Sequence, residues 1–403
     1  MAISQAAAAG DDGLTGWERG ERREAAEAAA IAADTSLSEP AKIDALARVR
    51  NWFAGDTSTI DRYLAGDLPL AEAVEMLAAP IDRAYSTADH GRKLWESERT
   101  ARNQRQYWSP EKALEMWGAQ EDFPEPAEET EGMLSTEGGL WELWYAVLHA
   151  AKRIPWYSPR DGEGQWEGEG EGEGEGQRPQ KRLLELVQAL KARPNPSPPE
   201  RMTTALRRDW IWDSGTLWSD LVMLGPSARE AWNDSPGCGA GWTAPEQRAW
   251  ANVNAFVARL TATATADFRL YAMWALRDAL EEDLKPRNLH VAAPPAVRLA
   301  SNVAAAAAWI LVAGDFLYAR HADGERYAQE ADVSLAARGK QLPWHGDNEI
   351  STARWRFWCR RFGQEAQNAE LPAEVRELAR RSGERINALE QADTERVVDG
   401  DSN

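Results

Sequence analysis

Tryptophans recur through this chain in segments whose apolar residues have helical spacing, and this pattern most constrains the fold. The 403 residues include 20 tryptophans. Trp232, Trp242 and Trp250, for example, lie on either side of a Gly-rich turn. Alternating Val, Ile and Thr bounded by turn residues, the pattern of strands, hardly occurs. The sequence therefore predicts an all-α fold: an irregular multi-helix bundle or array with no significant sheet.

Signals for helix starts agree with this prediction. Ser109-Pro110-Glu111 is typical of an N-cap followed by proline at the first helical position. The segments 227–230 and 243–246 both have capping-box spacing, with a carboxylate three residues after a hydroxyl. We expect helices to begin at these three places.

Composition suggests a division of the chain. We expect residues 1–38 to be mostly disordered or an isolated helix, 39–391 to form a single all-α domain, and 392–403 to be a disordered tail. The low-complexity Gly-Glu segment Gly162–Gly176 is either a boundary between domains or a flexible insertion within one. We favour the insertion because helix-forming, Trp-containing sequence of the same character lies on both sides.

Charge and cysteine content limit the partners and the compartment. The formal net charge is −19, so the surface repels nucleic-acid backbones and anionic membranes. Cys238 and Cys359 are far apart and in no CxxC pattern, which favours a reducing cytoplasm or nucleus. We expect no signal peptide. The most apolar run, Val303–Gly314, is shorter than the ~20 residues of a membrane span, so we expect a buried core helix.

Five stretches carry a resemblance to a known family. They are Leu217-Trp218-Ser219-Asp220-Leu221, Trp250-Ala251-Asn252-Val253-Asn254-Ala255-Phe256, Met273-Trp274-Ala275-Leu276-Arg277-Asp278-Ala279-Leu280-Glu281, Ala307-Ala308-Trp309-Ile310 with Ala313-Gly314, and Arg354-Trp355-Arg356-Phe357-Trp358-Cys359-Arg360-Arg361-Phe362. Across roughly residues 40 to 390 the chain resembles a filamentous-fungal family catalogued as a domain of unknown function. The resemblance implies a fungal, soluble, helical protein and brings no activity, cofactor or catalytic residue.

No pattern of catalytic or metal-ligating residues stands out. The five histidines lack ligand spacing, and no GxSxG or Walker sequence occurs. Gly237–Gly241 follows a polar run rather than a strand, so we interpret it as a turn and not as a phosphate loop. The nearest approach to an Asp-rich metal motif is 281–283, which we interpret as a solvated acidic helix end with Glu281 beside Arg277. We therefore predict no catalytic residue, metal or cofactor.

The basic and aromatic run 354–362 has two interpretations. Arginines with stacking aromatics can bind nucleic acid. On a helix, however, Trp355, Trp358 and Phe362 form one buried stripe, and aromatics that point inward cannot stack on bases. We expect a core helix and no binding of nucleic acid.

Polar residues inside nearly all-apolar helices are the candidates for a binding site. Asn252 and Asn254 lie between Trp250 and Phe256, and Arg277 and Asp278 precede Leu280. Buried polar groups need hydrogen-bond partners. These four residues are therefore either interhelical contacts that fix the packing or the polar patch of a ligand pocket.

Two functions remain open. The first is a non-enzymatic interaction or scaffold protein whose helical surface binds a protein partner. The second is a small-molecule binder or enzyme with a Trp-lined pocket around Asn252, Asn254, Arg277 and Asp278. The absence of paired catalytic groups favours the first.

Overall fold

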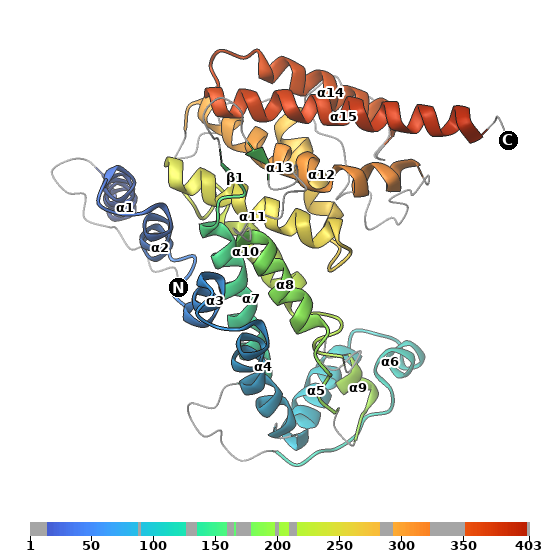
Figure 1. Cartoon of the computed structure of the whole chain (residues 1–403). Coiled ribbons are helices and arrows are strands. Elements are labelled where there is room, and N and C mark those ends of the chain that lie inside the picture. Colours follow the sequence, from blue (N-terminus) through green and yellow to red (C-terminus); the bar gives the residue numbers. More distant parts are fainter. Residues whose placement is uncertain are drawn as a thin grey trace. The chain divides into compact units, whose positions relative to one another are not determined.

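Helices dominate the part of the chain that the structure describes. The computed structural model describes residues 14–87, 90–125, 135–158, 165–166, 179–197, 201–208, 216–282, 293–322 and 351–400. Within them the only strands are the antiparallel pair β1 (Tyr157–Ser158) and β2 (Gln165–Trp166) (Figure 1). The predicted all-α fold is confirmed. The Gly162–Gly176 segment lies outside the described residues except for 165 and 166.

The chain forms two compact units. Unit 1 comprises Met1–Ala54, His149–Gln180 and Trp232–Asn403, and unit 2 comprises Gly55–Leu148 and Lys181–Ala231. Helices α7 (Thr136–Arg153) and α8 (Pro179–Lys191) contribute residues to both. The single domain expected over 39–391 stays a prediction.

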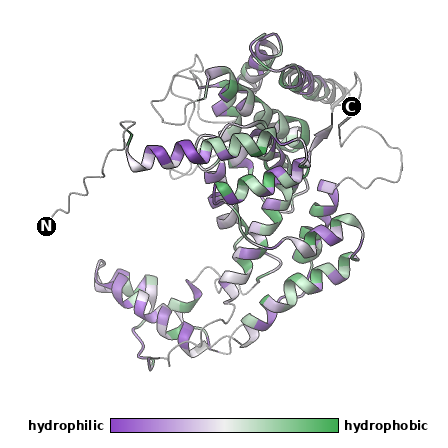
Figure 2. Cartoon of the chain, turned by 90° about the vertical axis from the view of Figure 1, so that its left-hand side faces the viewer, coloured by the Kyte–Doolittle hydropathy of each residue, from purple (hydrophilic) through white to green (hydrophobic). Residues whose placement is uncertain are grey.

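Unit 1 has a core of long helices around α13. Its remaining elements are α1 (Gly16–Ala33), α2 (Glu39–Val49), the 3₁₀ turn η1 (Trp232–Asp234), α11 (Ala244–Ala262), α12 (Arg269–Leu280), α13 (Pro295–Ala322), α14 (Thr352–Ala366) and α15 (Ala373–Gly400). Helix α13 contacts α11, α12 and α15, and α14 packs on α15. The helices carry both hydrophobic and hydrophilic residues (Figure 2), as amphipathic packing requires. Trp309, Trp355 and Trp358 are fully buried.

The apolar helix α13 contains the run Val303–Gly314. Its segment Pro295–Ala319 is long and apolar enough to cross a membrane by length and composition, with a mean hydropathy of 1.6. The core helix of a soluble protein passes the same test. Val303, Trp309 and Ile310 are fully buried against neighbouring helices, and 56% of the apolar window is buried.

The two ends of the chain contribute helices to unit 1. Helix α1 falls in the segment 1–38, expected to be mostly disordered or an isolated helix, and packs on α2 with Ala28 inside a core cluster that includes Ile43 and Trp52. Helix α15 extends to Gly400, through most of the tail for which disorder was expected.

Unit 2 is built on α3 (Ser58–Ala65), α4 (Leu70–Thr87), α5 (His90–Arg105), α6 (Pro110–Trp117), α9 (Thr204–Arg207) and α10 (Leu224–Ala231), with parts of α7 and α8. Two of its large buried side chains, Trp144 and Trp218, are indoles with hydrogen-bonded nitrogens. Nε1 of Trp144 donates to the carbonyl of Val222 at 2.7 Å, and Nε1 of Trp218 donates to Asp82 at 2.8 Å. Trp218, from the first family-like stretch, is therefore a core anchor.

Two of the three predicted helix starts are correct. Ser109 Oγ accepts the amide of Lys112 at the start of α6, and Thr243 and Glu246 form the capping box of α11. The prediction at Ser227 is wrong, because α10 already begins at Leu224 and Ser227 is buried within it. Capping-box spacing also occurs inside helices, where i and i+3 share a face.

Candidate functional site

Asn252, one of the predicted site residues, is a buried hydrogen-bonding hub on α11. Its Oδ1 accepts the amide of Trp156 at 3.2 Å, and its Nδ2 donates to the carbonyl of Lys152 at 2.9 Å. Gln180, which is fully buried, donates to the carbonyls of Asn252 and Ile154 at 3.0 and 3.1 Å. The side-chain amide of Asn252 therefore links α11 to the end of α7 and to the residues that follow α7.

Asn254 holds α11 against α13. Its Nδ2 donates to the carbonyl of Trp250 at 2.9 Å, and its Oδ1 accepts Nε1 of Trp309 at 2.9 Å. Both polar atoms of the side chain thus have protein partners in a fully buried position. This matches the interhelical role that the sequence left open as one of two interpretations.

Arg277 and Asp278 lie near the end of α12 and are partly exposed. Their side chains are 22% and 50% exposed and meet at 3.4 Å, with Glu282 at 3.7 Å from the guanidinium. They contrast with the two asparagines, whose side-chain atoms are committed to interior hydrogen bonds. The ligand pocket around these four residues stays a prediction.

Glu281 was expected to be a solvated helix end and is instead fully buried. Arg354 of α14 donates to its two oxygens, Nε at 2.7 Å and Nη2 at 2.9 Å. Nε1 of Trp358 donates to the same carboxylate at 2.7 Å. Three hydrogen-bond donors thus compensate the cost of burying this charge. A buried carboxylate without such partners would be strongly destabilising.

The predicted stripe on α14 is correct, since Trp355, Trp358 and Phe362 are all fully buried. The sequence interpretation missed Arg354, which shares the buried side. Arg356 lies outside, with 64% of its side chain exposed beside Glu390.

The Gly-rich loop before α11 packs around the ion pair of Glu246 and Arg50. The carboxylate of Glu246 accepts the amides of Gly241 and Thr243 at 2.8 and 2.9 Å and Nε of Arg50 at 2.8 Å. A Cβ at Gly241 would collide with the guanidinium of Arg50. The anion at this helix start is thus an internal carboxylate, which supports the interpretation as a turn.

His149 lies in a buried cluster of charged residues in unit 1. Its Nε2 is 2.7 Å from Asp44, and its ring stacks on Phe53 with 4.1 Å between centroids. Burial lowers the pKa of His149 to about 4, although the hydrogen bond that Nε2 donates to Asp44 acts to raise it, so the ring is neutral near pH 7. Because the residue is only 3% exposed, it is closed to a substrate. We assign it a role in packing.

Unit 2 presents the clearest exposed apolar feature. The described residues contain five exposed large hydrophobic side chains, and three of these, Tyr107, Trp108 and Leu114, fall within eight residues at the turn from α5 to α6. They are 74%, 47% and 59% exposed. We call these three residues the α5–α6 corner.

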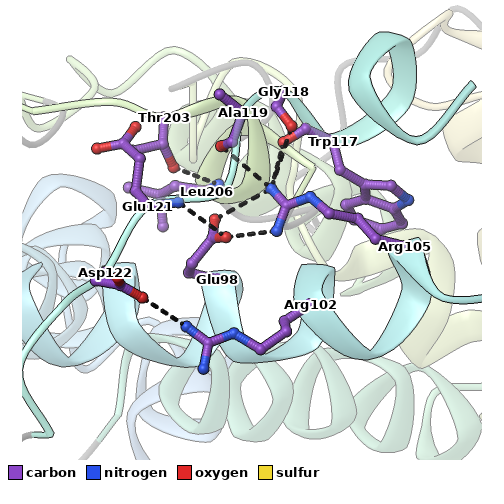
Figure 3. A network of polar contacts seen from close by, with 10 residues as sticks. All are labelled: Glu98, Arg102, Arg105, Trp117, Gly118, Ala119, Glu121, Asp122, Thr203 and Leu206. Atoms are coloured by element: carbon purple, nitrogen blue, oxygen red, sulfur yellow. Dashed lines mark hydrogen bonds and ion pairs between the residues drawn. The ribbon is translucent and has the colours of Figure 1, made fainter. Parts of the chain in front are cut away.

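A buried ion pair links the end of α5 to the backbone at the end of α6 (Figure 3). Arg105, at the end of α5, pairs with Glu98 and donates to the carbonyls of Trp117, Gly118 and Ala119 at 3.0 to 3.3 Å. The side chains of Arg105 and Glu98 are 13% and 4% exposed. The guanidinium therefore supplies donors to the unsatisfied carbonyls at the end of α6.

Two further contacts fix the same support. Glu98 also accepts the amide of Glu121 at 3.2 Å. Gly118 has a positive φ of 69°, and a Cβ there would lie 2.8 Å from Oγ1 of Thr204 in α9. Only glycine therefore meets both the conformation and the close approach. These contacts hold the backbone at the end of α6 against α5 and α9.

Metal-binding clusters are not found in the described part of the chain, where no group of three or more His, Cys, Asp or Glu side chains could hold an ion. No curated protein and no solved structure matches the sequence. Residues 144–362 match the family model described as "Protein of unknown function (DUF3632)". This region contains Asn252, Asn254 and the buried pair Glu281–Arg354, but not the α5–α6 corner. Since the match covers more than half of the 403 residues, the chain belongs to this family of proteins of unknown function.

Proposed function

We propose that the protein is a non-enzymatic interaction or scaffold protein and that the α5–α6 corner is its contact surface for a protein partner. The observation that carries this proposal is the exposure of Tyr107, Trp108 and Leu114 within eight residues of the chain, from the end of α5 into α6. Isolated exposed apolar residues are ordinary, but grouped ones mark interaction sites. Aromatic side chains are also the residue type most enriched among those that dominate binding energy.

The rigid support favours binding. A surface that is ordered before binding loses less conformational entropy when a partner docks. The ion pair of Arg105 with Glu98, together with the carbonyls at the end of α6, supplies that order. The buried asparagines of unit 1 favour the same conclusion, because their hydrogen-bonding capacity serves packing.

The source and compartment of the protein are proposals as well. The family-like stretches support a filamentous-fungal origin. Cys238 and Cys359 are both free thiols, which agrees with a reducing cytoplasm or nucleus. The net charge of −19 supports a protein partner over nucleic acid or an anionic membrane.

Site-specific photo-cross-linking tests the proposed function. A photoreactive phenylalanine analogue placed at Tyr107 should give one discrete cross-linked protein product in cells that express the chain naturally. The same analogue at Trp17, which is 59% exposed on α1 in unit 1, is the matched control and should not. Leu114→Ser should abolish capture from position 107. Equal capture at both positions, or capture unaffected by Leu114→Ser, would refute the proposal.

A further inference from the structure

We infer that the occupant of the α5–α6 corner is a second copy of this chain, docked about a two-fold axis. This inference rests on the proposed function, since it names the partner of the same surface. It depends on three properties of the corner: the charges that flank it, the local charge balance, and the apolar area that it offers.

The charges around Leu114 are self-complementary. Lys112 and Glu115 pair across 3.0 Å, with side chains that are 48% and 68% exposed, and Glu111 is exposed one turn before Glu115. A two-fold interface brings the same patch of both copies together, so each patch must complement itself. A surface on which Lys112 pairs with a neighbouring carboxylate can exchange this internal pair for two equivalent pairs across the axis.

The local charge balance permits two acidic chains to meet here. Residues 90–125 contain six Lys and Arg and seven Asp and Glu, in a chain with a net charge of −19. Most of the excess negative charge therefore lies elsewhere. Because exposed charges beyond about 10 Å are largely screened at ~0.1 M salt, the nearly neutral corner governs the approach of two copies.

The apolar area sets the strength of the contact. An aromatic side chain buries about 150–250 Å² in all, so the exposed parts of Tyr107, Trp108 and Leu114 offer roughly 300–400 Å² per copy. A standard stable interface buries about 800 Å² per partner. The expected complex is therefore a reversible dimer in the micromolar range or weaker.

Sedimentation equilibrium of the full chain tests the inference. From micromolar to millimolar concentration, the weight-average mass should rise from 44.7 kDa toward twice that value. The dissociation constant of the dimer should be at least tenfold higher for the double variant Trp108→Ser, Leu114→Ser. Trp17→Ser, the matched control, should associate like the wild type. Unfolding midpoints of all three proteins establish that each one is folded.

Charge exchange gives a second, independent readout. Lys112→Glu alone should weaken self-association, because carboxylates then face carboxylates. Mixing Lys112→Glu with the variant Glu111→Lys, Glu115→Lys should restore it as a heterodimer. A mass that stays at 44.7 kDa at every concentration, or association unchanged by the corner variants, would overturn the inference. If cross-linking from position 107 still captures a different protein, the proposed function survives; if neither occurs, both fail.

Discussion

Arg354 and Glu281 form a two-point ion pair that is completely buried between α14 and the end of α12, with Nε and Nη2 at 2.7 and 2.9 Å from separate carboxylate oxygens. Trp358 donates a third hydrogen bond to Glu281. The aromatic stripe and the buried charges of α14 therefore form one cluster, in which the indole contributes both apolar area and a donor.

Breaking this pair should destabilise the protein strongly. Arg354→Met leaves a buried carboxylate without its cation, which typically costs about 3–5 kcal/mol. The double variant Arg354→Met, Glu281→Leu should recover much of that loss, because no charge remains to be buried. Urea unfolding of the three proteins measures both effects. A loss below ~1 kcal/mol for Arg354→Met would show that solvent reaches the pair.

Trp358 should matter far more for stability than its neighbour Arg356. Trp358→Ala removes a fully buried side chain and should cost about 3–5 kcal/mol. Arg356→Ala removes a side chain that is 64% exposed and should change stability by less than about 0.5 kcal/mol. Unfolding midpoints give the comparison. Similar midpoints for the two variants would place Trp358 on the surface.

His149 should make stability depend on pH. Burial lowers its pKa to about 4 in the folded protein, from the ordinary histidine value of about 6.5. Between these values the unfolded chain binds a proton that the folded chain does not. The contribution of the neutral His149 ring to the free energy of unfolding is therefore fully present above pH 6.5. It is lost as the pH falls toward 4, and the loss reaches about 3 kcal/mol. His149→Gln, which cannot titrate, should flatten the stability curve in this window. An unchanged slope would contradict the assignment.

Nucleic acid should bind no better than at nonspecific levels. The run 354–362 looked basic and aromatic, but Trp355, Trp358 and Phe362 are buried and cannot stack on bases. Repulsion by a net charge of −19 acts in the same direction. Fluorescence anisotropy with duplex DNA and RNA at physiological salt checks this. Submicromolar, salt-sensitive binding would be inconsistent with it.

The features that could be predicted depend on local pattern. Helical periodicity placed Trp355, Trp358 and Phe362 on one buried side, and cap chemistry located the starts of α6 and α11. Such signals arise within a few residues, so a single sequence contains them.

The features that were missed depend on distant partners. The sequence alone suggests that Arg354 is solvated. Its burial depends on the ion pair with Glu281, which lies 73 residues earlier in the chain. Gln180 follows the Gly-Glu segment without any distinguishing pattern, yet it is buried against Asn252. The α5–α6 corner is equally unmarked, because leucine usually lies in cores and tyrosine is often partly buried, so Leu114 and Tyr107 do not indicate an exposed surface.

The central claim is that Tyr107, Trp108 and Leu114 are kept for binding and not for the stability of unit 2. The free energy of unfolding of the triple variant Tyr107→Ser, Trp108→Ser, Leu114→Ser tests it most directly. We predict a value within about 1.5 kcal/mol of the wild type, because a substitution of a largely exposed side chain typically changes stability by up to about 0.5 kcal/mol. A loss of several kcal/mol would show that these side chains pack in a core, and would contradict the account.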